Sequence, residues 1–261
     1  MSGSYETLDW YDVPRYYDLV FDEDTEREAD FLEAMVDRFG RGRGRRALEP
    51  ACGSGRLVEA LAARDWKVQG FDLSRPMLDH ARVRLDAAGL PARLFEARME
   101  DFRARGSIDL AHCLVSTFKY LLSESHARAH LECVARSLAP GGIYVLGFHL
   151  SEYEVMKRTR ERWVVRDGGT EVVCNIQSWP PDSRSRLERV RSRLRVTEGG
   201  RERRTETHWN FRSYDAAQVR RLLRSVPALE HLATYDFSYD LDAPRELDDD
   251  QLDLVLVLRR R

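Results

Sequence analysis

Two glycines, Gly53 and Gly55, stand one residue apart in the stretch ALEPACGSGR, directly before an apolar helical pattern. A dinucleotide-binding fingerprint has a third glycine at position 58, where it permits close helix–strand contact, but this sequence has Val58 there. A bound pyrophosphate would also lie near the carboxylate of Glu49, which would repel it. The glycine pair therefore favours a ligand that carries no phosphate at this point.

Two carboxylates flank this glycine pair, and their chemistry indicates the kind of ligand. Glu49 comes four residues before Gly53, at the predicted end of a strand, where it would attract an ammonium or a sulfonium. Asp72 comes nineteen residues after Gly53, at the end of the next strand, where a carboxylate can accept hydrogen bonds from both hydroxyls of a ribose. Together they predict an adenosyl ligand with a cationic, phosphate-free tail.

Alternating strand and helix patterns position these residues. Short apolar runs predict strands at 47–52, 67–72, 92–97, 108–116 and 143–148, with helices at 56–64, after Ser74 and at 124–138. An earlier helix is predicted at 25–39, with Thr25 and Glu28 as its capping box. This order predicts the α/β class, with a doubly wound, Rossmann-like parallel sheet that binds ligands at the carboxyl ends of its strands.

The pattern changes after the fifth strand. Residues 161–212 contain strand-like runs separated by Gly-Gly and Pro-Pro turns, which predict an antiparallel β insertion placed over the ligand end of the sheet. Ser213 is predicted to cap a further helix, and strands at 231–240 and 252–260 are predicted to close the sheet. The predicted segments are an N-terminal helical segment with the core (1–155), the insertion that covers the substrate (156–212) and a closing helix with strands (213–261).

Composition narrows the classes of function. The chain has 261 residues, 43% of them apolar, and a formal net charge of −2, which gives no global attraction to nucleic acid or to an anionic membrane. Its four cysteines form no C-x-x-C pair, which favours the cytoplasm, and no apolar run has the length of a signal peptide or a membrane span. No carboxylate cluster has metal-ligand spacing, so no metal is expected.

Five segments resemble those of class I S-adenosylmethionine-dependent methyltransferases in order and spacing: LEPACGSGR, VQGFDLSRPMLDHAR, ARLFEARMEDF, IDLAHCLVSTFKYLL and VARSLAPGGIYVLGF. They cover about residues 45–150, and YYDLVF near the N-terminus resembles the small-molecule branch, which includes glycine-type and aminosugar N-methyltransferases. The resemblance implies S-adenosylmethionine as cofactor and methyl transfer to N or O of a small-molecule acceptor. It does not specify the acceptor, and both a monomer and a homodimer stay open.

The resemblance also implies which residues hold the cofactor. The glycine loop would lie against its methionine part, a carboxylate would hold its ribose, and apolar side chains would surround its adenosine. The family often has an Asp before Met99, which accepts a hydrogen bond from the adenine amino group. Here Arg98 stands at that position, and a guanidinium cannot accept a hydrogen bond. Either Glu100 or a backbone carbonyl replaces the Asp, or selectivity for adenine is relaxed. The implied set is Tyr17, Glu49, Ala51, Gly53, Gly55, Asp72, Leu73, Met77, Met99, Glu100 and Leu114.

Candidates for the acceptor side lie in TETHWNFR, where strand alternation places His208 and Arg212 on one face and Trp209 on the other. The small-molecule branch often has a His–Arg pair here, so His208 is the first candidate for a base and Arg212 for an anion clamp. A surface strand histidine would fit His208 equally well. His149, just past the fifth strand, is the second candidate, and His112 is predicted to be a satisfied core histidine.

Other interpretations stay open. A nucleotide-dependent oxidoreductase is disfavoured by Val58 and Glu49, and a methyltransferase of RNA or protein, or an inactive S-adenosylmethionine-binding module, is the remaining alternative.

Four arginines alternate with smaller residues over 189–195. They predict a solvated outer face paired with acidic neighbours or, alternatively, an anion-binding wall. RNA is disfavoured because no aromatic residues interleave with these arginines.

Overall fold

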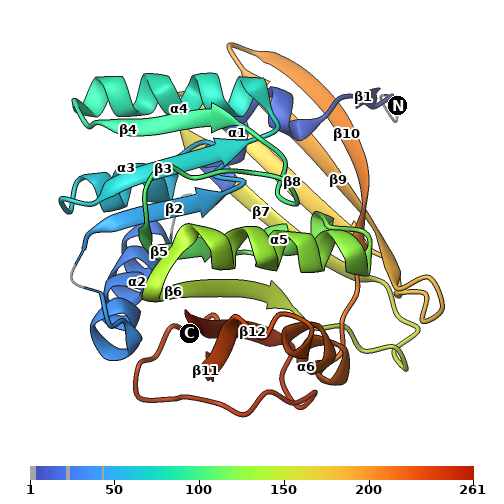
Figure 1. The fold of residues 1–261 in the computed structure, drawn as a ribbon. Coiled ribbons are helices and arrows are strands. Elements are labelled where there is room, and N and C mark those ends of the chain that lie inside the picture. The colour runs from blue at the N-terminus through green and yellow to red at the C-terminus, as the bar shows by residue number, and fades with distance from the viewer. Residues whose placement is uncertain (1–3, 22–23, 43) are drawn as a thin grey trace.

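The computed structural model describes residues 4–21, 24–42 and 44–261, which form two sheets (Figure 1). The larger sheet has the order β11-β12-β6-β5-β2-β3-β4. The five strands from β6 to the edge strand β4 run parallel, as the alternating pattern predicts, and β12 pairs antiparallel with both β6 and β11. The strands are β2 (Arg46–Pro50), β3 (Lys67–Asp72), β4 (Ala92–Glu96), β5 (Ile108–Cys113), β6 (Leu138–His149), β11 (Leu229–Tyr235) and β12 (Asp253–Arg260).

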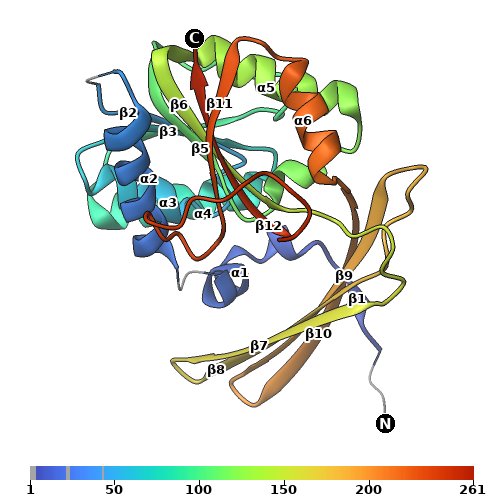
Figure 2. The same ribbon diagram turned by 90° about the horizontal axis from the view of Figure 1, so that it is seen from below.

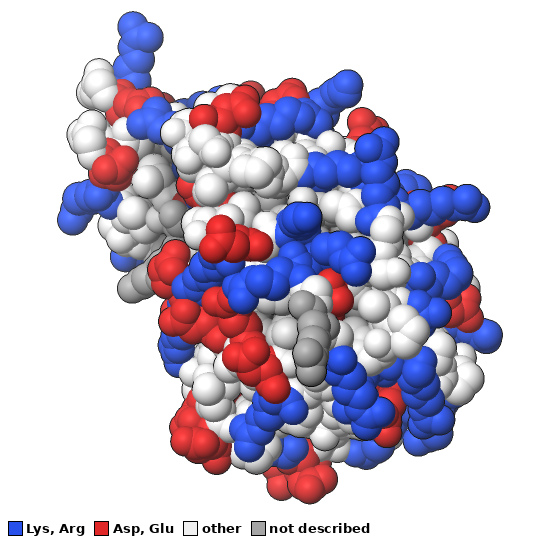
Figure 3. All heavy atoms as spheres, turned by 60° about the vertical axis from the view of Figure 1, so that its left-hand side comes forward, with Lys and Arg blue, Asp and Glu red and all other residues white. Residues whose placement is uncertain are grey.

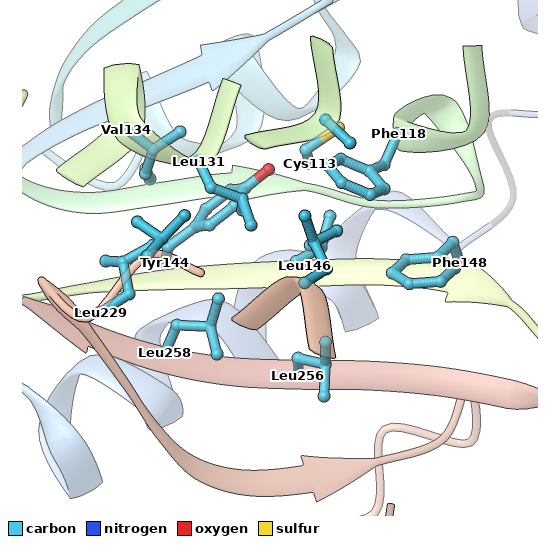
Figure 4. Packing of buried hydrophobic residues seen from close by; sticks show 14 of the residues in the cluster. Cys113, Phe118, Leu131, Val134, Tyr144, Leu146, Phe148, Leu229, Leu256 and Leu258 are labelled. Atoms are coloured by element: carbon cyan, nitrogen blue, oxygen red, sulfur yellow. The ribbon is translucent and has the colours of Figure 1, made fainter. Parts of the chain in front are cut away.

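Helices cover both faces of this sheet. The helices are α2 (Thr25–Phe39), α3 (Arg56–Ala62), α4 (Arg75–Ala88), α5 (Glu124–Ser137) and α6 (Ala216–Arg224). One apolar cluster joins α5 and α6 to the sheet, and a second joins α2, α3 and α4 to its other face. Figure 4 shows part of the first cluster, in which Leu131 and Val134 of α5 pack over Tyr144 and Leu146 of β6. The sheet is thus doubly wound, as predicted.

Two predicted helix caps are wrong. Asp24 precedes α2 and makes no side-chain capping bond, and Glu28 pairs with Arg56 rather than capping the helix. Helix α6 begins at Ala216, so its N-cap is Asp215, which forms a complete capping box with Gln218. The predicted cap Ser213 lies too far before the helix, and its hydroxyl contacts the Tyr153 hydroxyl at 2.9 Å. The cap of α4 is confirmed, since the Ser74 hydroxyl accepts a hydrogen bond from the backbone N–H of Met77.

The smaller sheet follows β6, the fifth parallel strand, where the insertion is predicted. It contains β7 (Thr159–Asp167), β8 (Thr170–Ser178), β9 (Leu187–Glu198) and β10 (Arg201–Arg212), all paired antiparallel. The short strand β1 (Glu6–Thr7) adds to β10 in parallel, so the N-terminal segment joins the sheet of the insertion. The division of the chain into segments 1–155, 156–212 and 213–261 stays a prediction.

The N-terminal segment also fills the space between the two sheets. Helices η1 (Trp10–Asp12) and α1 (Pro14–Phe21) lie beside the inner face of the smaller sheet (Figure 2). Trp10 and Val20 pack there against apolar side chains of β8 and β9, including Leu194 and Val196. Along β9 the buried residues alternate with the arginines at 189, 191, 193 and 195, which therefore lie on the outer face.

Charges of both signs lie side by side on the face of the molecule drawn in Figure 3. This mixture agrees with the small net charge of −2. None of the helices formed by the described residues has both the length and the apolar content that a bilayer crossing requires.

Candidate functional site

A pocket lies at the carboxyl ends of β2 and β5, which are neighbours in the sheet. Strand order reverses at this point, because β3 and β4 lie on one side of β2 whereas β5 and β6 lie on the other. Ligands of doubly wound sheets bind at such a position. The cavity measures about 50 Å³, and its lining comprises Tyr17, Glu49, Pro50, Ala51, Cys52, Gly53, Ser54, Arg56, Leu57, Cys113, Leu114, Val115 and Thr117. Five predicted cofactor residues, Tyr17, Glu49, Ala51, Gly53 and Leu114, are thus brought together.

The loop after β2 has a left-handed backbone at alternate residues. Ala51, Gly53 and Gly55 have φ angles of 54°, 53° and 78°. A Cβ atom on Gly53 would meet nothing within 4 Å, so the space beside this backbone is open. A Cβ atom on Gly55 would lie 2.8 Å from the Cβ of Ala81, so this glycine permits α4 to approach the loop closely. The two glycines therefore serve different purposes, access for a ligand and helix packing.

The carboxylate of Asp72 fixes the shape of this loop. One oxygen accepts a hydrogen bond from the backbone N–H of Gly53 at 2.9 Å, and the other accepts from Ser74 at 2.8 Å. Burial raises the pKa of Asp72, although these backbone hydrogen bonds oppose the shift. Because a carboxylate oxygen can accept more than one hydrogen bond, Asp72 can still accept from a ligand while it holds the loop.

A close helix–strand contact is made without a glycine at position 58. Val58 is fully buried on α3 and faces Gly70 of β3. A Cβ atom on Gly70 would lie 3.0 Å from Val58 Cγ2 and 2.9 Å from Cys52 Sγ. The glycine that permits this contact is therefore on the strand rather than on the helix, which explains how the larger residue fits at position 58.

Glu49 presents an unpaired carboxylate oxygen beside the pocket. Its side chain is buried, and Oε2 has no hydrogen-bond partner among the described residues. Burial raises the pKa of Glu49 to about 8, although the nearby Arg56 cation opposes the shift. Buried polar atoms are nearly always paired, so this oxygen is suited to a donor supplied by a ligand.

His112, a neighbour of Glu49, differs in one respect from the satisfied core histidine that the sequence predicts. The histidine is fully buried, as predicted, but it is not satisfied, since neither ring nitrogen has a hydrogen-bond partner in the described part of the chain. Its Nδ1 lies 3.9 Å from Glu49 Oε1, which is too long for a hydrogen bond. Burial lowers the pKa of His112 to about 3, and the nearby Arg56 cation adds to this shift. His112 is therefore a neutral neighbour of Glu49.

Arg56 is a pocket residue that the sequence analysis did not single out. Its guanidinium forms an ion pair with Glu28 of α2 and donates to the Thr25 hydroxyl at 3.1 Å. Glu28 also accepts a hydrogen bond from the Tyr239 hydroxyl at 3.0 Å. No sequence signal distinguishes this arginine from one on a helix surface, because its partner lies on a distant helix.

The chain leaves β5 through a strained turn that the sequence also does not reveal. Val115 and Ser116 have φ angles of 56° and 66°, a region that β-branched residues rarely adopt. Val115 lines the pocket and is 48% exposed, and Leu73 beside Asp72 is 55% exposed. The turn thus presents an apolar side chain to the pocket.

Four residues predicted for the adenosine side, Leu73 among them, do not line the cavity. Met77 is fully buried on α4, and Met99 packs in the cluster beneath α5. The carboxylate of Glu100 accepts a hydrogen bond from Arg98 Nε at 2.6 Å. Burial tends to raise the pKa of Glu100, but this hydrogen bond holds it below its usual value. Which group binds the adenine amine stays a prediction.

His208 lies on the outer face of the smaller sheet, away from the pocket. It is exposed, and its Nε2 contacts Glu206 Oε1 at 2.6 Å. The adjacent Trp209 takes the inner face and stacks on Trp10, with the ring centroids 4.9 Å apart. Strand alternation sends neighbouring side chains to opposite faces, so the burial of Trp209 turns His208 outward.

The other two acceptor-side candidates occupy different places. Arg212 is buried and donates to the Leu122 carbonyl and to Glu124 Oε2 at 3.0 and 2.9 Å, so it ties β10 to the start of α5. His149 lies at the carboxyl end of β6, where its Nδ1 contacts Asp253 Oδ1 at 2.8 Å. Its backbone N–H donates to the hydroxyl of Ser116, which lies between the lining residues Val115 and Thr117, whereas His149 itself does not line the cavity.

Comparison with known proteins identifies the kind of domain that the chain resembles. Residues 47–142 match a family model described as a methyltransferase domain. A dTDP-3-amino-3,6-dideoxy-alpha-D-glucopyranose N,N-dimethyltransferase of Streptomyces fradiae is 31% identical over 138 residues, which cover 52% of each chain. The chain spans about half the length of this relative.

Solved structures resemble the chain over nearly its whole length. An S-adenosylmethionine-dependent methyltransferase from Clostridium acetobutylicum superimposes with a TM-score of 0.78 at 19% identity, covering 96% of this chain and 98% of that chain. A sugar N-methyltransferase from a Streptoalloteichus species gives a TM-score of 0.75 at 21% identity, covering 100% and 97%. These likenesses establish the fold.

Proposed function

We propose that this chain, whose residues 47–142 form a methyltransferase domain, transfers a methyl group from S-adenosylmethionine to N or O of a small-molecule acceptor. The observation that carries the proposal is the unpaired oxygen of Glu49 beside a glycine loop with open space, at the point where strand order reverses. A carboxylate there favours the cationic amino-acid tail of this cofactor and disfavours a pyrophosphate.

Residues that line the pocket, together with Asp72 beside it, suit the cofactor's parts. Glu49 Oε2 is an acceptor for the ammonium, and Asp72 is an acceptor for the ribose hydroxyls. Burial raises the pKa of Tyr17 to about 12, so its hydroxyl stays protonated and can donate to the cofactor carboxylate. When bound, the cofactor supplies a methyl group activated by a positively charged sulfur, so the protein mainly has to align the acceptor and exclude water. Leu114 and Val115 provide apolar surface for this purpose.

We assign the role of general base to His149 rather than to His208. Asp253 contacts Nδ1 of His149, which leaves Nε2 available to take a proton from the acceptor. His208 is on the opposite face of the smaller sheet, and Arg212 is engaged by Glu124, so neither is placed to touch an acceptor in the pocket. The acceptor class of the Streptomyces relative supports an amine of a sugar as the first acceptor to test.

The cysteines support a reducing location. All four, at positions 52, 113, 133 and 174, are free and buried. Free thiols persist in the cytoplasm, which we propose as the site of action. The acceptor is a small molecule, and the working form is a monomer or a homodimer.

The function is tested first by calorimetry and then by methyl transfer. We expect the chain to bind S-adenosylhomocysteine and not NAD, and to transfer a radiolabelled methyl group to an amino sugar. Replacing His149 with glutamine is expected to lower kcat roughly tenfold without changing S-adenosylhomocysteine affinity, since water can partly replace a half-exposed base. Binding of NAD but not of S-adenosylhomocysteine would refute the proposal, and full activity of H149Q would remove His149 from the mechanism.

Cofactor affinity is also expected to depend on pH through Glu49. Its pKa of about 8 means that most of this carboxyl is protonated at neutral pH, whereas the cofactor's ammonium favours the ionised form. Binding should therefore release a proton, and affinity should rise with pH, by up to about tenfold per pH unit, until it levels off near pH 8. Calorimetry in buffers of different ionisation enthalpy measures the proton. The E49Q variant should show no such release, and equal release by both proteins would contradict the assignment.

A further inference from the structure

A second cavity lies on the outer face of the smaller sheet. It measures about 430 Å³, which is within the range of small-molecule binding sites. The pocket at the carboxyl ends of β2 and β5 lies on the opposite side of this smaller sheet. Tyr17, which lines that pocket, packs against the inner face of the sheet. The lining comprises Tyr5, Arg160, Glu161, Arg162, Asn175, Ile176, Gln177, Arg191 and Arg193.

Strand register arranges four arginines around this cavity. In one row, Arg162 of β7 pairs with Asn175 of β8, which pairs with Arg193 of β9. In the adjacent row the corresponding residues are Arg160, Gln177 and Arg191. The Cα atoms of two arginines on the same strand are therefore about 6.6 Å apart, and those of two arginines in the same row are about 9.6 Å apart. Asn175 or Gln177 of β8 lies between the two arginines of each row.

Positive charge is only partly balanced here. Glu206 is shared, since it forms an ion pair with Arg193 and lies 3.7 Å from Arg191 Nε. Arg160 and Arg162 are exposed and form no ion pair with any described residue, although Glu161 also lines the cavity. Burial and the neighbouring Arg193 lower the pKa of Arg191, although Glu206 opposes the shift. An anion in the cavity would relieve this repulsion.

We propose that this cavity binds a small molecule that carries a diphosphate. Arginine forks hold phosphate oxygens in bidentate geometry, and two linked phosphates offer enough oxygens for arginines of both rows to bind at once. The volume exceeds that of a diphosphate, so it also accommodates an organic group, beside the ring of Tyr5 that lies 4.5 Å from the Arg193 guanidinium. A molecule bound here is not the methyl acceptor, because the sheet separates it from the cofactor pocket.

The test uses the full chain with S-adenosylhomocysteine present, so that the cofactor pocket is blocked. Calorimetry with inorganic diphosphate and with uridine diphosphate should detect binding that weakens as salt is added. The double variant R160Q/R162Q should bind uridine diphosphate at least tenfold more weakly, with unchanged affinity for S-adenosylhomocysteine. The control is R166Q. Arg166 is on the same strand, but it pairs with Glu171 and does not line the cavity. The affinity of R166Q for uridine diphosphate should stay within twofold of that of the unmodified chain.

Several outcomes would overturn this inference. One is the absence of binding of either diphosphate at millimolar concentration, and another is an equal loss of affinity in R166Q and in the double variant. Binding of single-stranded RNA or of phosphatidylserine vesicles through the same arginines, without binding of diphosphates, would assign the face to a different ligand. A dimer of the unmodified chain that dissociates in R160Q/R162Q would assign the cavity to a second copy. S-adenosylhomocysteine affinity is measured separately, so failure here is distinguishable from failure of the proposed function.

Discussion

Replacing Asp72 with alanine is expected to weaken S-adenosylhomocysteine binding by about 2–3 kcal/mol, which is roughly 30- to 150-fold. The change removes the acceptor for the ribose hydroxyls. It also frees the backbone N–H groups of Gly53 and Ser74, which the carboxylate now holds at 2.9 and 2.8 Å, so the glycine loop loses its fixed shape. Isothermal titration calorimetry at constant pH measures the loss directly.

Two further variants separate these contributions. In D72N one acceptor oxygen remains, so the loss of affinity should be intermediate. The matched control is D79A, because Asp79 is an exposed carboxylate on α4 that pairs only with Arg82 among the described residues, and its removal should leave affinity unchanged. A D72A protein that binds as tightly as the unmodified chain would remove the ribose assignment.

Replacing Arg56 with methionine is expected to lower the free energy of unfolding by about 3–5 kcal/mol. Arg56 and Glu28 form an ion pair whose side chains are 14% and 3% exposed. Removal of the cation leaves the Glu28 carboxylate buried without its ion-pair partner, although it still accepts a hydrogen bond from the Tyr239 hydroxyl. It also removes the charge that opposes protonation of Glu49. Urea unfolding at neutral pH measures the change.

A double-mutant cycle tests whether the buried charge is the cause. The E28Q/R56M protein should recover part of the lost stability, because it no longer buries an unpaired carboxylate. The R82M control removes an exposed arginine that pairs with Asp79 and should change stability by less than about 0.5 kcal/mol. A loss below about 1 kcal/mol in R56M would show that the pair contributes little.

The part of the site that could be predicted from sequence lies in one short segment. Glu49, Ala51 and Gly53 are close in the chain, so strand-end geometry alone brings them to the same pocket. Asp72 was predictable because a parallel neighbour must end at the same edge, and its hydrogen bond to Gly53 agrees with that placement. The roles of these residues toward the cofactor stay predictions.

Other parts of the site depend on contacts between distant segments. Arg56 acquires its partner from α2, and the left-handed conformation of Val115 has no counterpart in residue preference. The orientation of His208 was decided by Trp209, which packs on Trp10 about two hundred residues earlier in the chain. Periodicity identified two alternating faces, but it could not identify which of them is covered.

The sequence by itself determined the doubly wound sheet, the place of the insertion and the adjacency of Glu49, Gly53 and Asp72, because local periodicity and strand order are properties of short segments. Only the tertiary structure decided that β1 joins the inserted sheet, that His112 lies unpaired beneath Glu49, and that the arginines of β7 and β9 surround one cavity. These features arise from pairing between distant segments, whose partners and register are selected by burial of the whole chain rather than by any local pattern.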